Sequence, residues 1–158
     1  MSVEKLTKKC GLIHATVAKI ADSIVGDFEV KVDNPNSQAI IDSFIKSSNF
    51  KLNLRTWIQE GLAKGNGFIE LDLENEKMRV MNANYMYVKR NKKGQVLEYN
   101  QWTKPLRQFN RDSPDMINFK PNKIAHLPIN KIPNDPYGIG IIWPNERIIQ
   151  NLILNEQD

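Results

Sequence analysis

The sequence is poor in the side chains that build disulfides and metal sites, with one cysteine and two histidines among 158 residues. Cys10 has no partner for an intrachain disulfide, which favours a reducing, intracellular environment. His14 and His126 stand far apart, and neither an HExxH nor a CxxC motif accompanies them. We therefore expect no bound metal, and we expect His126, within a strand pattern, to hydrogen-bond a nearby backbone group.

Long apolar runs are missing as well. No uninterrupted stretch approaches the roughly 18 residues that a membrane-spanning helix needs. Polar residues interrupt the N-terminal segment throughout, so it lacks the continuous apolar block of a signal peptide. The sequence therefore predicts a globular protein that has no membrane partner.

Motifs for catalysis are equally absent. No GxSxG nucleophile elbow occurs, and Cys10 falls on an apolar stripe, where a thiol behaves as a small buried hydrophobe. The GIGIIW stretch at 138–143 places bulky residues where a phosphate-binding loop needs small ones. Gly65-Asn66-Gly67 follows a helix pattern and precedes a strand pattern, which is the reverse of such a loop. We expect no catalytic residues, no cofactor and no enzymatic activity.

What is present is an ordinary globular composition, 41% hydrophobic and 25% charged, with a net charge of +4. The positive excess lies in residues 51–110, where eleven Lys and Arg face six Asp and Glu. Its focus is the cluster Lys89, Arg90, Lys92 and Lys93. Such a cluster can contact nucleic acid or an acidic partner weakly, but a solvated hairpin tip is the simpler interpretation.

Residues 1–67 carry mainly helical spacing. Two helices are predicted around Ile40–Ile45 and Leu54–Leu62, and Gly65-Asn66-Gly67 stops the second. Before them, Phe28–Val32 (FEVKV) alternates like a short strand. A first helix, capped by Ser2 and ended by Gly26, is predicted from apolar steps of three and four at Val3, Leu6, Cys10, Ile13, Val17, Ile20 and Ile24.

From Phe68 the pattern changes to short β-branched and aromatic runs, which predict one antiparallel sheet of five or six strands across 68–129. Asn91–Gly94 (NKKG) suits a hairpin turn, with Gly94 at positive φ. A closing helix has Pro144 in its first turn, where the missing N–H costs nothing. The predicted fold class is α+β, as a single domain over 1–158 with a mainly helical part (1–67), a sheet (68–129), and a corner with a cut-off helix (130–158).

The segment between the sheet and the closing helix has the composition of a structural corner. Three prolines withhold backbone donors, which keeps the segment out of a sheet interior. Two glycines permit a tight turn, and two large aromatic rings can pin it to the core. These residues are Pro128, Pro133, Pro136, Gly138, Gly140, Tyr137 and Trp143.

Several short motifs follow one another in a fixed order. A helix with Trp57 ends at Gly65-Asn66 before Phe68, and a Phe-x-Pro strand then leads through Ile-x-His to a Tyr-Gly-aliphatic corner and an apolar helix. Together they resemble the portal proteins of tailed bacteriophages and related archaeal viruses. Gly140 departs from that pattern, since the family usually has serine there, and the proline comes late, at Pro144. The structural signature residues are Gly65, Asn66, Phe119, Pro121, His126, Tyr137 and Gly138.

The resemblance implies a virion structural protein rather than an enzyme. Portal subunits form a homo-oligomeric ring, typically a dodecamer, at one capsid vertex, through which viral double-stranded DNA is packaged and ejected. The implied partners are other portal subunits, capsid protein, the terminase and neck proteins. The implied location is the virion, and the host cytoplasm during assembly.

Portal chains are much longer than this one, and their stem, clip and tunnel loop follow the corner. This chain is therefore expected to be the outer wing region alone, from a truncated chain or a short or split gene. No tunnel residue can be assigned within it.

A second interpretation is a small nucleic-acid-binding module. Aromatic side chains that alternate on a sheet can stack bases, and a basic hairpin can neutralise phosphates. The module would use the basic cluster at 89–93 with Tyr85, Tyr87, Tyr99 and Trp102. An enzyme with an unrecognised site is the least favoured interpretation.

Overall fold

The computed structural model describes residues 3–102 and 116–155. Helices come first, antiparallel strands follow and a short helix closes the order, so the α+β class is confirmed. The elements are α1 (Val3–Lys9), α2 (Gly11–Val25), α3 (Pro35–Ser47), α4 (Phe50–Lys64), β1 (Asn66–Asp72), β2 (Lys77–Met81), η1 (Ala83–Tyr85), β3 (Met86–Arg90), β4 (Val96–Trp102), β5 (Met116–Phe119), η3 (Pro121–Lys123), β6 (Ile124–Pro128), η4 (Trp143–Asn145) and α5 (Glu146–Asn155).

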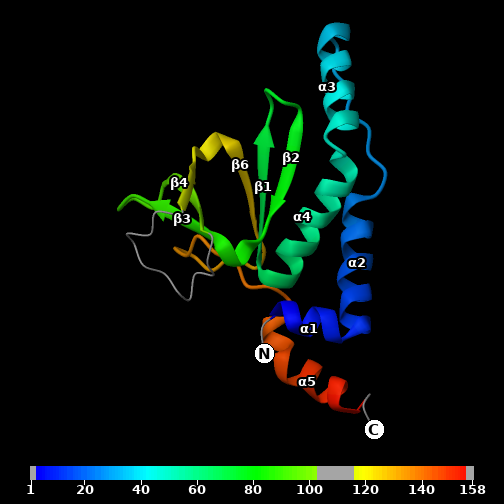
Figure 1. Cartoon of the computed structure of the whole chain (residues 1–158), viewed down its shortest axis with the longest axis vertical. Helices are drawn as coiled ribbons and strands as arrows, with labels where there is room; N and C mark the ends of the chain where they lie inside the picture. The colour runs from blue at the N-terminus through cyan, green and yellow to red at the C-terminus, as the bar shows by residue number, and fades with distance from the viewer. Residues whose placement is uncertain (1–2, 103–115, 156–158) are drawn as a thin grey trace.

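The first predicted helix is broken in two at Cys10, whose backbone is extended (φ −106°, ψ 101°). α1 lies across the end of α2 rather than continuing its axis (Figure 1). The break allows Leu6 and Cys10 to enter the helical core, where they are 1% and 0% exposed. Gly26 ends α2 as predicted, with a φ of 53°, whereas the predicted cap Ser2 lies outside the described residues.

The break also changes which face of α2 is buried. Val17, Ala21 and Val25 point inward, whereas the predicted stripe members Ile20 and Ile24 are 36% and 57% exposed. The extended residue Cys10 rotates the side chains of α2 relative to those of α1. Apolar residues that follow steps of three and four across the break therefore do not all lie on one continuous face.

α3 and the segment before it lie on the outside of the molecule. Asn34 caps α3 by accepting from the backbone of Asn36 and Ser37 at 2.9 and 3.3 Å. The prediction of a strand at Phe28–Val32 is wrong, because this segment belongs to neither sheet. Its apolar side chains are only partly covered, although the Phe28 ring packs edge-on against Phe50 with centroids 5.5 Å apart.

The six described strands form two three-stranded antiparallel sheets rather than the single predicted sheet. One sheet has the order β2-β1-β6 and the other β3-β4-β5. The chain leaves the first sheet through the short turn η1, builds the β3–β4 hairpin, and returns to pair β6 with β1. The hairpin turn at Asn91–Gly94 is confirmed, with Gly94 at φ 82°.

Two apolar clusters hold the fold. One lies among α1, α2, α4 and α5 and includes Leu62 and Ile149. The other joins the two sheets through Phe68, Met86 and Tyr99. The sheets split because both must bury a face against this second cluster, which one flat sheet cannot do. The predicted closing helix is α5, and Pro144 precedes it within η4.

Candidate functional site

The signature residues converge where α4 ends, β1 begins and the corner crosses them. Gly65 caps α4 in the left-handed region, at φ 88°, and donates its N–H to Gly61 O at 2.8 Å. Asn66 then opens β1 and is 8% exposed. A left-handed cap is the usual reason for glycine directly after a helix.

The side chain of Asn66 joins two distant segments. Its Oδ1 accepts from Gly138 N and lies 3.0 Å from His126 Nε2, while its Nδ2 donates to Gly138 O at 3.3 Å. An amide oxygen only accepts, so His126 carries its proton on Nε2. His126 was expected to bond a backbone group, and its partner is instead this side chain.

His126 is held as a neutral ring. Burial lowers its pKa to about 4, and the charge of Lys131 acts in the same direction. The ring stacks on Phe68 with centroids 4.2 Å apart and planes 13° from parallel. A neutral, stacked, hydrogen-bonded imidazole suits a structural role better than proton transfer near neutral pH.

The corner approaches the end of α4 so closely that it has no room for side chains. A Cβ on Gly138 would collide with Ile129 O and lie 2.5 Å from Gly65 O. A Cβ on Gly140 would lie 2.6 Å from Gly65 N. Neither residue has a positive φ, so their dihedral angles do not require glycine. The physical reason for glycine at both positions is close contact with the backbone of neighbouring segments.

Backbone hydrogen bonds also connect the corner to the end of α4 and to the start of β1, and this region is called the joint below. Ile129 N donates to Gly65 O, Ile139 N to Ile129 O and Ile141 N to Leu62 O, at 2.8, 2.8 and 2.9 Å. The corner is therefore tied to α4, β1 and β6 at once, which makes it a rigid joint between the helical part and the sheets.

Tyr137 connects the joint to the second sheet, β3-β4-β5, by a hydrogen bond. Its hydroxyl accepts from Val88 N of β3 at 2.9 Å, and burial raises the pKa of this phenol. The expectation that Trp143 also pins the corner is wrong, because this ring is 64% exposed. Its place on η4 turns it away from the core that Ile142, 2% exposed, occupies.

Phe119 and Pro121 lie before the joint. Phe119 ends β5 opposite Tyr99 and packs against the inter-sheet cluster. Pro121 begins the η3 turn that leads into β6. They direct the chain from one sheet into the other.

The basic cluster lies apart from the joint's centre, on the β3–β4 hairpin. Two of its members are engaged within the chain: Lys89 Nζ bonds Glu98 Oε1 at 2.8 Å, and both terminal nitrogens of Arg90 donate to Asn134 O at 3.1 Å. Lys92 and Lys93 lie exposed at the turn, beside an open groove of about 650 Å³ that Tyr87, Pro136 and Tyr137 also line.

The aromatic residues of the alternative interpretation do not form an open stacking surface. Tyr99 and Trp102 are 7% and 6% exposed and belong to the protein interior. Tyr85 and Tyr87 are half-buried. The alternation in β4 therefore reflects the packing of its inner face.

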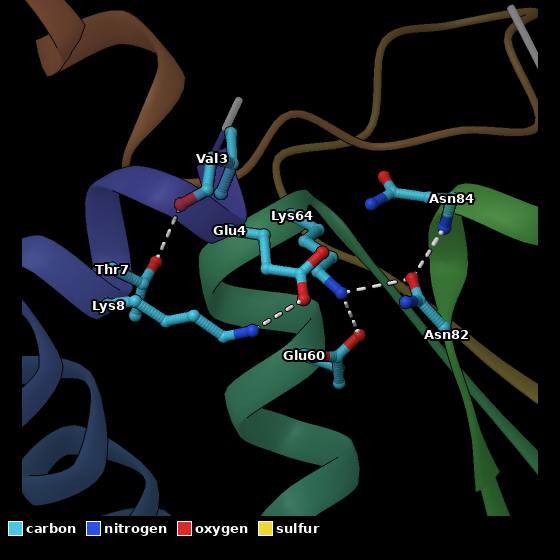
Figure 2. A network of polar contacts seen from close by, with 8 residues as sticks. All are labelled: Val3, Glu4, Thr7, Lys8, Glu60, Lys64, Asn82 and Asn84. Carbon is cyan, nitrogen blue, oxygen red and sulfur yellow. Dashed lines mark hydrogen bonds and ion pairs between the residues drawn. The ribbon is translucent and has the colours of Figure 1, made fainter. Parts of the chain in front are cut away.

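The sequence interpretation missed a polar network around Lys64, at the end of α4 (Figure 2). Lys64 has a 9% exposed side chain, and its Nζ donates to Glu60 Oε2 at 2.7 Å and to Asn82 Oδ1 at 3.0 Å. Asn82 in turn accepts from Asn84 N at 3.0 Å. The i,i+4 spacing of Glu60 and Lys64 was visible in the sequence, but their burial against η1 was not.

Neither a cluster of metal ligands nor a membrane-spanning helix occurs in the part of the chain that the structure describes. Residues 3–102 and 116–155 contain no group of three or more His, Cys, Asp or Glu side chains placed to hold a metal ion. Within those ranges no helix is both long and apolar enough to cross a bilayer.

Comparisons with known proteins identify the fold. No protein-family model and no curated protein matches the chain. A chain of the virion of a native gene transfer agent (GTA) particle matches 95% of this chain at 14% identity, with a TM-score of 0.71. A chain of the neck of an empty GTA particle, computed with C6 symmetry, matches 94% at 15% identity, with a TM-score of 0.69.

This chain spans about two fifths of both matched chains, 41% and 42% of their lengths. At these identities the likeness establishes the fold alone, and it is a fold that also occurs in chains of phage-like GTA particles.

Proposed function

We propose that this chain is a structural protein of a phage-like virion, and that it forms the outer wing region of a portal ring. The observation that carries the proposal is the fold match, which extends over nearly the whole chain to components of a virion and of its neck. The sequence signature supports the finer, portal-specific part, because five of its members, Gly65, Asn66, His126, Tyr137 and Gly138, meet at one joint.

The joint suits a role as a rigid connection between the helical part and the sheets. Asn66, Gly138 and His126 link three chain segments by hydrogen bonds of 3.0–3.3 Å, and glycines bring backbone onto backbone. Such a joint fixes the helical part relative to the sheets, which a ring subunit needs if its neighbours are to repeat the same contacts. In this proposal the chain has no chemistry of its own.

The proposed partners are other copies of the subunit, capsid protein, the terminase and neck proteins, with viral DNA passing through the ring. The matched neck was computed with C6 symmetry, which accords with the proposed ring assembly. The proposed location is the virion, with host cytoplasm as the site of assembly.

Cofractionation tests the proposal. Particles from cells that carry the gene are treated with nuclease and separated on a density gradient, and an antibody against residues 3–102 follows the protein. The protein should sediment with particles that protect DNA. Its absence from those particles, together with a soluble cellular pool, would remove the virion assignment.

The virion proposal and the nucleic-acid-binding alternative predict different DNA binding for the isolated chain. Under the virion proposal, Lys89 and Arg90 are engaged internally and only Lys92 and Lys93 neutralise phosphates, so log K should fall with log salt at a slope of about −2. Binding to a labelled duplex should fade near physiological salt, and Lys92→Ala with Lys93→Ala should abolish it. Tight binding to single strands at that salt, measured by fluorescence anisotropy, would favour the module.

A further inference from the structure

The segment Phe28–Val32 keeps the pattern of a strand although it pairs with no strand of its own chain. Phe28, Val30 and Val32 share one face and are 39%, 36% and 38% exposed. Glu29 and Lys31 share the other face, with side chains 73% and 77% exposed and an ion pair of 3.0 Å between them. An ion pair between residues two apart fits extended backbone, in which they lie on the same side.

Gln38 of α3 already pairs with one edge of this segment. Its Nε2 donates to Val30 O and its Oε1 accepts from Val32 N, both at 2.9 Å. In a strand the N–H and C=O of residues two apart point to the same edge. The side-chain amide therefore acts as a short substitute for a neighbouring strand on the edge formed by Val30 and Val32.

The opposite edge is open. It presents the backbone N–H and C=O groups of Glu29 and Lys31, and no other backbone group among the described residues pairs with them. Every residue from 26 to 34 is exposed, and the segment runs along the outside of the helices, away from both sheets (Figure 1). An exposed edge of this kind is a template for a further strand.

We propose that this edge binds the same segment of a second copy of the chain, antiparallel, with Val30 opposite Val30 of that copy. The charge order selects this occupant. In that register Glu29 of each copy lies opposite Lys31 of the other, so both cross-strand pairs are attractive. The backbone agrees, because Glu29 and Lys31 are the residues whose N–H and C=O groups face outward.

The apolar face matches as well. Phe28 lies opposite Val32 of the second copy, and the two Val30 side chains meet at the two-fold axis. These three side chains are partly exposed in the single chain, and the pairing covers them further. The contact is isologous, so it closes at two copies.

This pairing goes beyond the proposed ring, whose head-to-tail contacts use two different patches. It describes an association of subunits outside the ring. The strand is short and the buried area small, so the dimer should be weak, with a dissociation constant of roughly 0.1–1 mM.

Charge exchange tests the register. The chain and the variants E29K, K31E and E29K/K31E are compared by sedimentation velocity from 10 µM to 1 mM at low salt. Either single substitution places like charges opposite each other twice and should weaken the dimer at least about tenfold. The double variant restores opposite pairs and should recover the dimer, as should an equimolar mixture of the two single variants.

Matched controls separate the register from net charge. Glu74→Lys and Lys92→Glu make the same changes of charge at exposed positions outside the segment and should leave the dimer intact. In hydrogen exchange the amides of Glu29 and Lys31 should gain protection with concentration, whereas that of Val32, already bonded to Gln38, should not.

Three results would overturn the pairing. One is a chain that stays monomeric up to 1 mM. Another is a dimer that both single variants retain. The third is a mixture of E29K and K31E that associates no better than either variant alone. None of these results bears on the virion assignment, which the gradient experiment tests separately.

Discussion

Gly138→Ala probes the closeness of backbone contact at the joint. The added methyl group would collide with Ile129 O, and it would lie 2.5 Å from Gly65 O and 2.6 Å from Ile129 N. All three neighbours are backbone atoms, so the corner itself must move away. That movement threatens the two bonds between Asn66 and Gly138 and the bond from Ile139 N to Ile129 O.

The magnitude follows from these losses. Three hydrogen bonds at about 1 kcal/mol each, with an overpacking cost of about 1–3 kcal/mol, predict a loss of roughly 4–6 kcal/mol in the free energy of unfolding. Urea titration followed by tryptophan fluorescence measures it. Gly11→Ala is the matched control, because its Cβ meets nothing within 4 Å and its φ is not positive. If both variants unfold at the same urea concentration, the close-contact explanation fails.

Three further predictions concern the groups around the joint. Tyr137→Phe should cost about 1–2 kcal/mol in urea titrations, because Val88 N loses its partner in a partly buried place. The pKa of His126 lies below its ordinary 6.5, at about 4; the unfolded chain therefore binds the proton first, and stability should fall as the pH drops from 6.5 towards 4, a slope that His126→Gln should reduce. Lys64→Ala should cost about 1–3 kcal/mol, because the Glu60 carboxylate loses its cationic partner and Asn82 loses one of its two donors. The exposed Lys8→Ala should cost less than about 0.5 kcal/mol.

Local sequence signals predicted the structure correctly at positions where a single residue ends a helix or closes a turn. Gly65 stops α4 because a left-handed cap follows the helix, and Gly94 closes the β3–β4 hairpin at positive φ. The α+β class followed from the change of periodicity, which occurs at Asn66, two residues before the predicted position.

Long-range packing decided the features that local patterns did not predict. The split into two sheets depends on the cluster between them, which only the return of β6 to β1 creates. Cys10 breaks the first helix although the apolar steps continue across it. Phe28–Val32 has strand spacing without an intramolecular strand partner, because the nearest edge partner is the side chain of Gln38.

The sequence identified the residues of the joint, but it did not predict the contacts that they make. The motif order singled out Asn66, His126 and Gly138, yet no local rule places an asparagine at position 66 beside a glycine at position 138. The reason for glycine at position 138 could not be predicted either, because it depends on the backbone of Ile129 and Gly65, which lies against it in the folded chain.

An asymmetric cryo-electron microscopy reconstruction of purified particles from cells that carry the gene tests the central claim most directly. The account predicts that the fold of residues 3–102 and 116–155 fits repeated density in a ring at a single vertex, on the outer side of that ring. Density for this fold throughout the icosahedral shell, or nowhere in the particle, would contradict it.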